Sequence, residues 1–333
     1  MNTGMRSFFD YKQFLLAVLS LMLPLGLMAQ EREVVVVTDT FRLPATFVAP
    51  SSRVQKVPCV VFIHGSGPND RDETVGPNKL FRDLADSLAA HGIASLRYEK
   101  RTRIYGAASL PAGREMDYDV EVVDDALSAL QWAAEQTEVD GSQLFVVGHS
   151  LGAMLAPRIA ERAPQVAGVV MLAAPARKLT DLLIGQSIFL RNLYEKMPGV
   201  PPAALQQLDE LQEKARNAQR LGTAEYDEAL GLPAGLTPSY LKMDQQYDPV
   251  KTAFALKQPL MLVQGERDYQ VTMVDYALWC AGLMMRTGVT YCSYPKLNHL
   301  MREGEGPASP TEYATPKPLP QQLVTDLVRF IKP

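Results

Sequence analysis

A serine near the middle of the chain has the surroundings of a nucleophile. Ser150 lies in the sequence GHSLG at 148–152, which matches the pattern G-x-S-x-G. In this pattern the serine sits on a sharp strand-to-helix turn, and the glycines remove Cβ atoms that would collide there. A continuous apolar run precedes it at 144–147, and apolar residues at helical spacing follow it. We therefore expect Ser150 to attack a carbonyl carbon; the alternative is a glycine-rich turn with a structural serine.

A serine hydroxyl needs a base to remove its proton, and the base needs a third group to orient it. Only His299 lies C-terminal to Ser150, in a loop directly after the last expected strand. The other three histidines are His64, His91 and His149. As the acid we expect Asp268, which lies in the loop after the preceding strand. Its rivals are Glu266, which is closer to that strand, and Asp275, which falls inside the next expected helix.

Two backbone N–H groups are expected to stabilise the negative charge on an attacked carbonyl. Leu151 begins the helix after the nucleophile, where N–H groups lack intrahelical acceptors and the helix dipole is positive. Ser66 lies in the glycine-rich loop 65–68 after an apolar strand, and such a loop supplies the second donor in hydrolases with this turn. A plain turn is the alternative for this loop. The charged residues 69–73 are expected to rim the site, either solvated or paired among themselves.

The fold class follows from the alternation of segments. Apolar strand-like runs alternate with helix-like segments from residue 58 to 174, and the strands resume at 259–264. This alternation predicts an α/β fold with a mostly parallel central sheet flanked by helices. Two earlier segments, 33–38 and 41–49, predict an antiparallel hairpin at one edge of the sheet. The loops that carry the three candidate side chains should all lie at the carboxyl ends of the strands.

Residues 176–256 interrupt the alternation. This stretch is helix-like, charged and punctuated by prolines, and it contains no apolar strand. We interpret it as a helical lid inserted between two parts of one core, 30–175 and 257–333. Ligands of open α/β sheets bind above the strand ends, where a lid excludes water and selects the substrate. The alternative is a helical subdomain with no role in selectivity.

The first 29 residues have the composition of a secretory signal peptide. Arg6 and Lys12 precede a short apolar run, and the small residue Ala29 ends the segment. We expect cleavage after Ala29 and export to the periplasm or the medium. The apolar run is shorter than the roughly 20 residues that a membrane-spanning helix needs, so we expect no stable span after cleavage. An uncleaved anchor is the alternative.

The composition argues against several classes of partner. The 333 residues are 47% hydrophobic with a net charge of −4 and no basic stripe, so nucleic acid is not an expected partner. No spacing of histidines or cysteines suggests a metal site. Cys59 lies within an apolar strand, whereas Cys280 and Cys292 could pair in an exported protein. We expect a small-molecule ester or a short peptide as substrate, and the sequence indicates no oligomeric state.

Five motifs make the chain similar to bacterial secreted α/β-hydrolases of the serine esterase and serine aminopeptidase type, over roughly residues 33–332. The motifs are HGSGPNDRDETVGPNK (64–79), LRYEKRT (96–102), GHSLG (148–152), QGERDYQV (264–271) and LNHLM (297–301). The resemblance implies an α/β-hydrolase fold, no cofactor, and a triad whose chain order is Ser150, Asp268, His299. Relatives often carry Asp where this chain has Glu99, a departure that affects no catalytic role.

Three functions are compatible with these residues. The first is a secreted serine hydrolase that cleaves carboxylic esters through an acyl-enzyme intermediate. The second is a serine peptidase of aminopeptidase type, in which carboxylates would bind the free amine of the substrate. The candidates for that task are Asp209, Glu210 and Glu213, or Asp70 and Asp72. The third is a non-catalytic binding protein of the same fold, which the intact set of three candidate residues disfavours.

Overall fold

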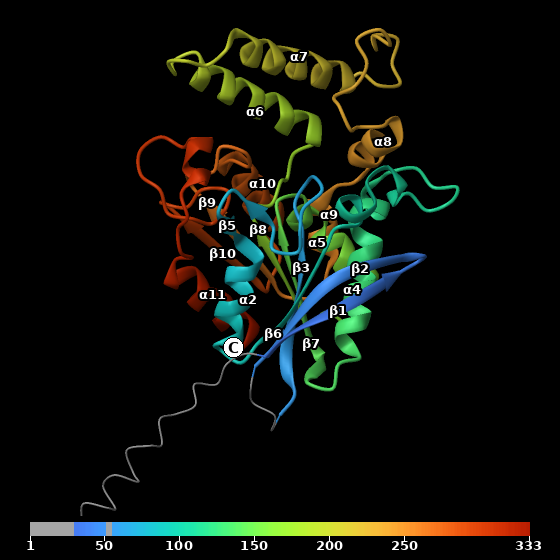
Figure 1. Ribbon diagram of the computed structural model, residues 1–333, viewed down its shortest axis with the longest axis vertical. Helices are drawn as coiled ribbons and strands as arrows, with labels where there is room; N and C mark the ends of the chain where they lie inside the picture. Colours follow the sequence, from blue (N-terminus) through green and yellow to red (C-terminus); the bar gives the residue numbers. More distant parts are fainter. Residues whose placement is uncertain (1–29, 51–54) are drawn as a thin grey trace, which may run out of the picture.

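A single eight-stranded sheet forms the centre of the molecule (Figure 1). The computed structural model describes residues 30–50 and 55–333, so the expected signal peptide lies outside the described residues. The order of strands across the sheet is β1-β2-β6-β3-β7-β8-β9-β10. These strands are β1 (Gln30–Thr38), β2 (Phe41–Ala49), β3 (Val57–Ile63), β6 (Ala94–Tyr98), β7 (Val139–His149), β8 (Gly168–Leu172), β9 (Leu260–Gly265) and β10 (Val289–Tyr294).

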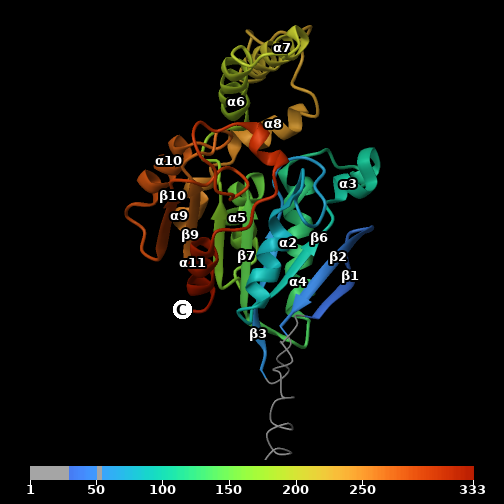
Figure 2. The same ribbon diagram turned by 60° about the vertical axis from the view of Figure 1, so that its left-hand side comes forward.

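The sheet is parallel from β6 to β10, and only β1 and β2 run antiparallel to their neighbours. The expected hairpin of β1 and β2 therefore lies at one edge, and β10 lies at the other (Figure 2). Every residue of β8 and β9 is buried, as expected for parallel strands covered on both faces. All six strands from β6 to β10 thus direct their carboxyl ends to one side of the sheet, where β7 carries the candidate nucleophile at its end.

The helices that accompany the sheet are α2 (Leu80–Ala89), α3 (Arg101–Tyr105), α4 (Asp124–Ala134), α5 (Leu151–Arg162), α6 (Leu179–Tyr194), α7 (Pro202–Ala218), α8 (Pro238–Gln246), α9 (Pro249–Ala255), α10 (Met273–Leu283) and α11 (Gln321–Ile331). Six of them form two layers over its faces. The apolar faces of α2 and α11 share one core with one face of the sheet, and α4, α5, α9 and α10 share the other. These two cores hold the loops at the strand ends in place.

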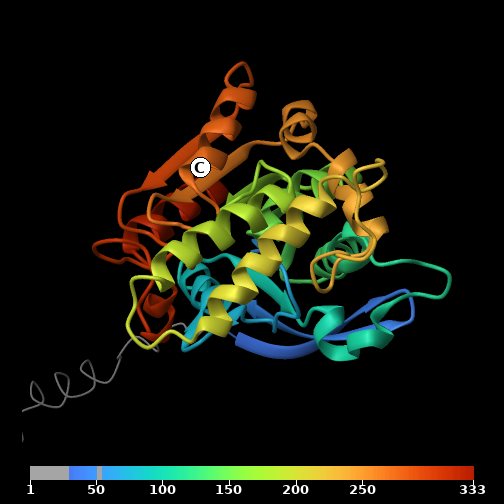
Figure 3. The same cartoon turned by 90° about the horizontal axis from the view of Figure 1, so that it is seen from above.

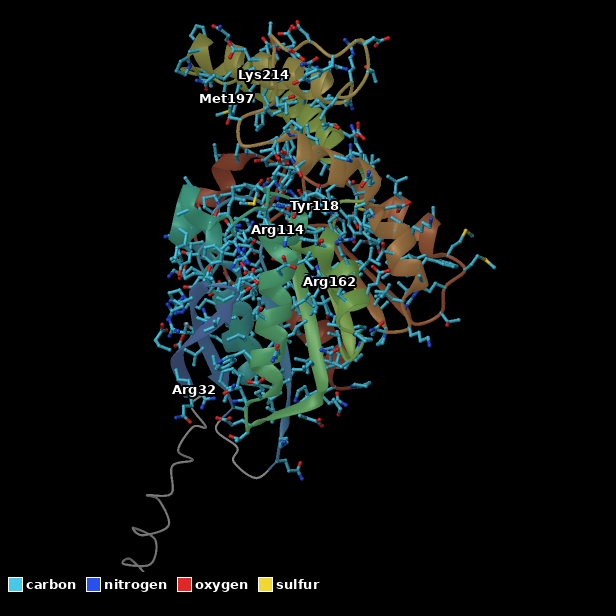
Figure 4. The ribbon with its side chains drawn as sticks, turned by 90° about the vertical axis from the view of Figure 1, so that its right-hand side faces the viewer. Arg32, Arg114, Tyr118, Arg162, Met197 and Lys214 are labelled. Atoms are coloured by element: carbon cyan, nitrogen blue, oxygen red, sulfur yellow. The ribbon has the colours of Figure 1, made fainter. Side chains whose placement is uncertain are left out.

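The insertion, residues 176–256, consists of α6 to α9 and the segments that join them. Helices α6 and α7 pack side by side above the carboxyl ends of the strands (Figures 1 and 3). In Figure 4, Met197 and Lys214 lie in this upper layer, Tyr118 lies beneath it at the top of the core, and Arg32 lies at the opposite end. The last helix, α9, packs against α5 and α10 instead, as part of the layer on the sheet.

The segment after β6 is more ordered than its sequence predicts. Residues 102–116 read as a loop, but α3 and a short 3-10 helix, Gly106–Ser109, occupy its first half. Arg101 at the start of α3 is fully buried and bonded to Asp125 of α4, with its guanidinium over the Phe41 ring. Because these partners are distant in sequence, the local pattern of apolar residues does not predict α3. Further along, apolar residues at helical spacing in 118–135 predict a helix, and in the structure a π-helical turn, Asp119–Val123, precedes α4 there.

Three further features concern the described residues alone. None of their helices is both long enough and apolar enough to span a membrane. No group of three or more His, Cys, Asp or Glu side chains within 30–50 and 55–333 is arranged to hold a metal ion. Cys59, Cys280 and Cys292 are all free, so the possible pairing of Cys280 with Cys292 is not formed.

Candidate active site

Ser150 lies at the corner between β7 and α5 in a backbone conformation that side-chain-bearing residues rarely adopt. Its φ is 53° and its ψ is −119°. A Cβ on Gly148 would lie 2.3 Å from the Gly152 carbonyl oxygen, and one on Gly152 would lie 2.2 Å from the Ile63 oxygen. Glycine is therefore required on both sides of the turn, because the chain of α5 passes directly against β3 and β7. This close packing holds the Ser150 side chain out at the strand ends.

We expect Gly152→Ala to destabilise the protein by about 3 kcal/mol or more, because the new Cβ would meet backbone atoms that cannot rotate away. Urea unfolding of the purified variant measures this loss. Gly141→Ala is the matched control, since a Cβ there lies 3.8 Å from its nearest neighbour, the Ala134 oxygen. The control should stay within about 1 kcal/mol of wild type. Equal stability of the two variants would contradict the steric account of the turn.

His299 and Asp268 contact each other through side chains supplied by neighbouring strand ends. His299 Nδ1 lies 2.7 Å from Asp268 Oδ2, and both side chains are buried. The other oxygen of Asp268 accepts backbone N–H groups from Gln270 at 2.8 Å and Val271 at 3.0 Å. The carboxylate is thus held from both sides. This geometry leaves Nε2 of His299 as the ring nitrogen available to a substrate or nucleophile.

The two rival acids are engaged elsewhere. Asp275 caps α10 together with Thr272 and forms an ion pair with Arg177. Glu266 accepts a hydrogen bond from the Ser293 hydroxyl at the surface. Neither carboxylate contacts His299, so the arrangement of side chains favours Asp268 as its partner.

Ser150 and His299 line the same cavity, which has a volume of about 850 Å³. No hydrogen bond joins their side chains directly in the structure of the described residues. Such bonds are often long in the absence of substrate. The expected donors Ser66 and Leu151 also line this cavity. The structure thus brings four of the five expected site residues to one cavity, with the fifth, Asp268, behind His299.

The cavity has mostly apolar walls. The core contributes one part of its lining and the insertion contributes another, chiefly through α6 and the segment before α8. The apolar lining residues from the insertion are Leu179, Leu182, Leu183, Leu211, Pro233, Ala234 and Leu236. Met116, Met154 and Leu300 are among the apolar residues that the core contributes. Such walls fit an uncharged chain or ring of a substrate.

One wall of the cavity is polar and was not foreseen from the sequence. Glu121 accepts hydrogen bonds from Lys100 Nζ and from the Tyr240 hydroxyl, the latter at 2.6 Å. Tyr240 belongs to α8, and its neighbour Tyr118 donates to Asp244 of the same helix at 2.7 Å. Burial raises the pKa of Tyr240, and the Glu121 carboxylate adds to that effect. The bonds of Tyr240 to Glu121 and of Asp244 to Tyr118 thus hold α8 of the insertion against the core.

A second buried pair, Glu73 and His149, lies under the nucleophile turn. Nδ1 of His149 is 3.1 Å from Oε2 of Glu73, and each side chain is only 4% exposed. The expectation that residues 69–73 are merely solvated or self-paired is therefore wrong for Glu73. The unusual charge of that loop was the only local sign of a buried group, but the partner of Glu73, His149, lies 76 positions away at the end of β7.

His64, by contrast, is buried between the rings of Phe81 and Tyr98, and burial lowers its pKa to about 4.

The pair between Glu73 and His149 should make stability depend on pH. Burial alone would raise the pKa of Glu73, but the charge and hydrogen bonding of His149, the charge of His64 and the Gly65 N–H together hold that pKa below its ordinary value of 4.5. Burial alone would lower the pKa of His149, but Glu73, the His299 carbonyl and the charge of Asp268 together raise that pKa above 6.5. Glu73 therefore stabilises the fold above pH 4.5 and loses this effect as the pH falls further. His149 stabilises the fold below pH 6.5 and loses this effect as the pH rises through its raised pKa.

We therefore expect the stability difference between wild type and Glu73→Gln to be largest between about pH 4.5 and 6.5. It should decline on either side, with a slope of at most about 1.4 kcal/mol per pH unit for one proton. Urea unfolding of both proteins from pH 4 to 9 measures the difference. A difference that stays constant across this range would show that the two groups do not form an ion pair in solution.

Comparisons with known proteins agree with this architecture. A sequence model described as the alpha/beta hydrolase family matches residues 60–313. Esterase EstD of Thermotoga maritima is 38% identical over 274 residues, which cover 82% of this chain. The chain spans 62% of the length of that relative.

Solved structures show the same fold at low sequence identity. The Pyrococcus furiosus esterase Pf2001 superposes with a TM-score of 0.58 at 14% identity, covering 93% of this chain and 92% of that one. A puromycin-hydrolyzing peptidase of Mycobacterium tuberculosis gives a TM-score of 0.57 at 15% identity, covering 93% of this chain and 41% of that one. With the family match over most of its length, the mostly parallel eight-stranded sheet and the flanking helix layers, the chain belongs to the alpha/beta hydrolase family.

Proposed function

We propose that the protein is a serine hydrolase that cleaves carboxylic esters through an acyl-enzyme intermediate on Ser150. The observation that carries this proposal is the strained Ser150 turn, which opens on the same cavity as His299, whose ring is bonded to the buried Asp268. A serine that shares a cavity with a histidine, itself bonded to a carboxylate, has the composition of a catalytic triad. The esterase of Thermotoga maritima to which the chain is similar supports the same choice of reaction.

The reaction runs in two stages. In the first, Nε2 of His299 takes the proton of Ser150 while Oγ bonds to the acyl carbon, and the carbonyl oxygen becomes an oxyanion held by the N–H groups of Ser66 and Leu151. The C–O bond to the alcohol then breaks, and the alcohol leaves with the proton from His299. In the second stage a water molecule gives a proton to His299 and attacks the acyl carbon. The acid is released, and the proton returns to Ser150.

The charge of the cavity favours an ester over a peptide with a free amine. Among the described residues that line it, Glu73 and Glu121 are the carboxylates, and each is already paired, Glu73 with His149 and Glu121 with Lys100. The carboxylates considered for amine binding do not line the cavity: Asp209, Glu210 and Glu213 are exposed on α7, and Asp70 and Asp72 bond to other side chains and backbone groups. An ammonium group would therefore find no free counter-charge, whereas an uncharged acyl chain would contact apolar walls.

We also propose that the insertion acts as a lid and that residues 1–29 direct export. The insertion supplies many of the apolar side chains around the cavity, which supports a role in choosing the substrate. The positive residues, the short apolar run and Ala29 support cleavage of a signal peptide. Mass spectrometry of the protein from the periplasmic fraction would give its first residue. An intact N-terminus would show that the segment is not removed.

A substrate panel tests the proposed activity. Wild type and Ser150→Ala are assayed against p-nitrophenyl esters of increasing acyl length and against aminoacyl and dipeptidyl anilides. The proposal expects ester turnover that the variant lacks, with a preference for acyl chains that the cavity can enclose. Anilide turnover rivalling that of the esters would place a peptidase first. The absence of any signal above the variant would favour the binding protein.

A further inference from the structure

The pair formed by Glu73 and His149 has no part in the proton transfers described above, yet it lies directly beneath the reacting groups. His149 immediately precedes Ser150, and the centres of its ring and the His299 ring are 4.7 Å apart. Glu73 lies in the loop after β3 with a φ of 52°, in the left-handed region that an L-residue rarely adopts. Contacts from the surrounding structure must hold Glu73 in this conformation.

Glu73 fixes the loop that carries one expected oxyanion donor. Its Oε1 accepts the backbone N–H of Gly65 at 2.6 Å. The carbonyl oxygen of Gly65 in turn accepts from Lys100 Nζ at 2.9 Å and from Asn69 Nδ2 at 3.1 Å. That oxygen and the N–H of Ser66 belong to one planar trans peptide, so they point in opposite directions. Holding Gly65 on both its N–H and its C=O therefore sets the direction of the Ser66 N–H.

His149 reaches from Glu73 to the backbone of the expected base. Its Nε2 lies 2.8 Å from the carbonyl oxygen of His299, and its Nδ1 faces the Glu73 carboxylate. Each nitrogen thus faces an oxygen acceptor, and both are donors only when the ring is protonated. A buried imidazolium is tolerated here because the Glu73 carboxylate neutralises it. The ring thereby spans the gap between the oxyanion loop and the loop of His299.

We propose that Glu73 and His149 are positioning residues, which tie the backbone of the oxyanion loop to the backbone of His299 and so set the distance between oxyanion donor and base. This inference rests on the proposed function. The pair joins three segments: the loop of Gly65 and Glu73, the turn that carries His149, and the loop of His299. These segments come from distant parts of the chain. Its loss should misplace donor and base relative to each other while leaving the apolar walls of the cavity intact.

The test measures kcat and KM of Glu73→Ala, Glu73→Gln and His149→Gln on the best ester, together with their thermal stability. We expect kcat of Glu73→Ala and His149→Gln to fall about 10- to 100-fold, because a shift of about 1 Å in a reacting group can cost 100-fold. KM should stay within about twofold, because the oxyanion donor and the base act on the transition state, whereas the apolar walls that bind the substrate are unchanged. Having two such variants covers the case in which one of them fails to fold.

Glu73→Gln separates geometry from charge. Its amide oxygen can still accept from Gly65, and its NH₂ group can donate to Nδ1 of a neutral His149, which keeps its Nε2–H for the His299 carbonyl. We therefore expect this variant to recover kcat to within about fivefold of wild type, with the lower stability near pH 5 described above. A kcat as low as that of Glu73→Ala would show that the charge, and not the positioning, is what matters.

Asp125→Ala is the matched control for buried charge. Asp125 pairs with Arg101 at a similarly buried site, and it does not line the cavity. It should lose stability while keeping kcat. An unchanged kcat in folded Glu73→Ala and His149→Gln, or an equal fall in Asp125→Ala, would overturn the positioning role. If wild-type turnover does not depend on Ser150 at all, the proposed function fails and this inference fails with it.

Discussion

Ser150→Ala is expected to lower kcat for ester hydrolysis by about 10⁴-fold or more. The substitution removes the oxygen that would form the bond to the acyl carbon, and no other hydroxyl takes its place on the turn. The variant should keep the wild-type fold, because Ser150 already has a φ of 53° and alanine is smaller at the same position. Any remaining rate would come from the oxyanion donors and the cavity alone.

The measurement combines steady-state kinetics with labelling by a fluorophosphonate, whose mass adduct is read by peptide mapping. Wild type should carry one adduct on the peptide that contains Ser150, and the variant should carry none. Ser142→Ala serves as the control, because Ser142 is exposed on β7 and its hydroxyl donates to Asp140 at the surface. An adduct on a different serine, or full activity of Ser150→Ala, would remove Ser150 from the reaction.

Asp268→Asn is expected to lower kcat by about 10⁴-fold with little change in the fold. Gln270 and Val271 donate N–H groups to one oxygen of Asp268, so the amide oxygen of asparagine should occupy that place. Its NH₂ group would then face Nδ1 of His299 and donate to it. Nδ1 would have to be the unprotonated nitrogen, and the proton would lie on Nε2. In that tautomer His299 cannot accept the proton of Ser150.

Two control variants identify the acid. Asp275→Asn should lower stability, because this side chain caps α10 and pairs with Arg177, but it should leave kcat within a few-fold of wild type. Glu266→Gln should change neither property by much, since its carboxylate accepts from the Ser293 hydroxyl at the surface, a bond that the amide oxygen of glutamine can keep. Stopped assays at several pH values compare all three variants. A kcat for Asp275→Asn as low as that for Asp268→Asn would reopen the choice of acid.

The features that the sequence determined by itself are local ones. The GHSLG turn could be placed because consecutive residues encode the strand, the turn and the helix, and because Gly148 is required by a backbone contact within that unit. The parallel sheet followed from apolar runs alternating with helical periodicity. Parallel order then placed the loops of Asp268 and His299 at the same edge, because β9 and β10 are neighbours and their carboxyl ends meet there.

The tertiary structure alone decided which charged residues are buried and what they contact. Glu121 and Tyr240 are 119 positions apart, and His149 and the His299 carbonyl are 150 apart, yet each pair is in hydrogen-bond contact. A charged residue in a loop has the same local sequence signature whether it is solvated or buried. Burial of a charge is stable only with a partner, and the packing of distant segments supplies that partner. For this reason the residues expected to react could be named from the chain, whereas Glu73, Lys100 and Glu121, which hold the site together, could not.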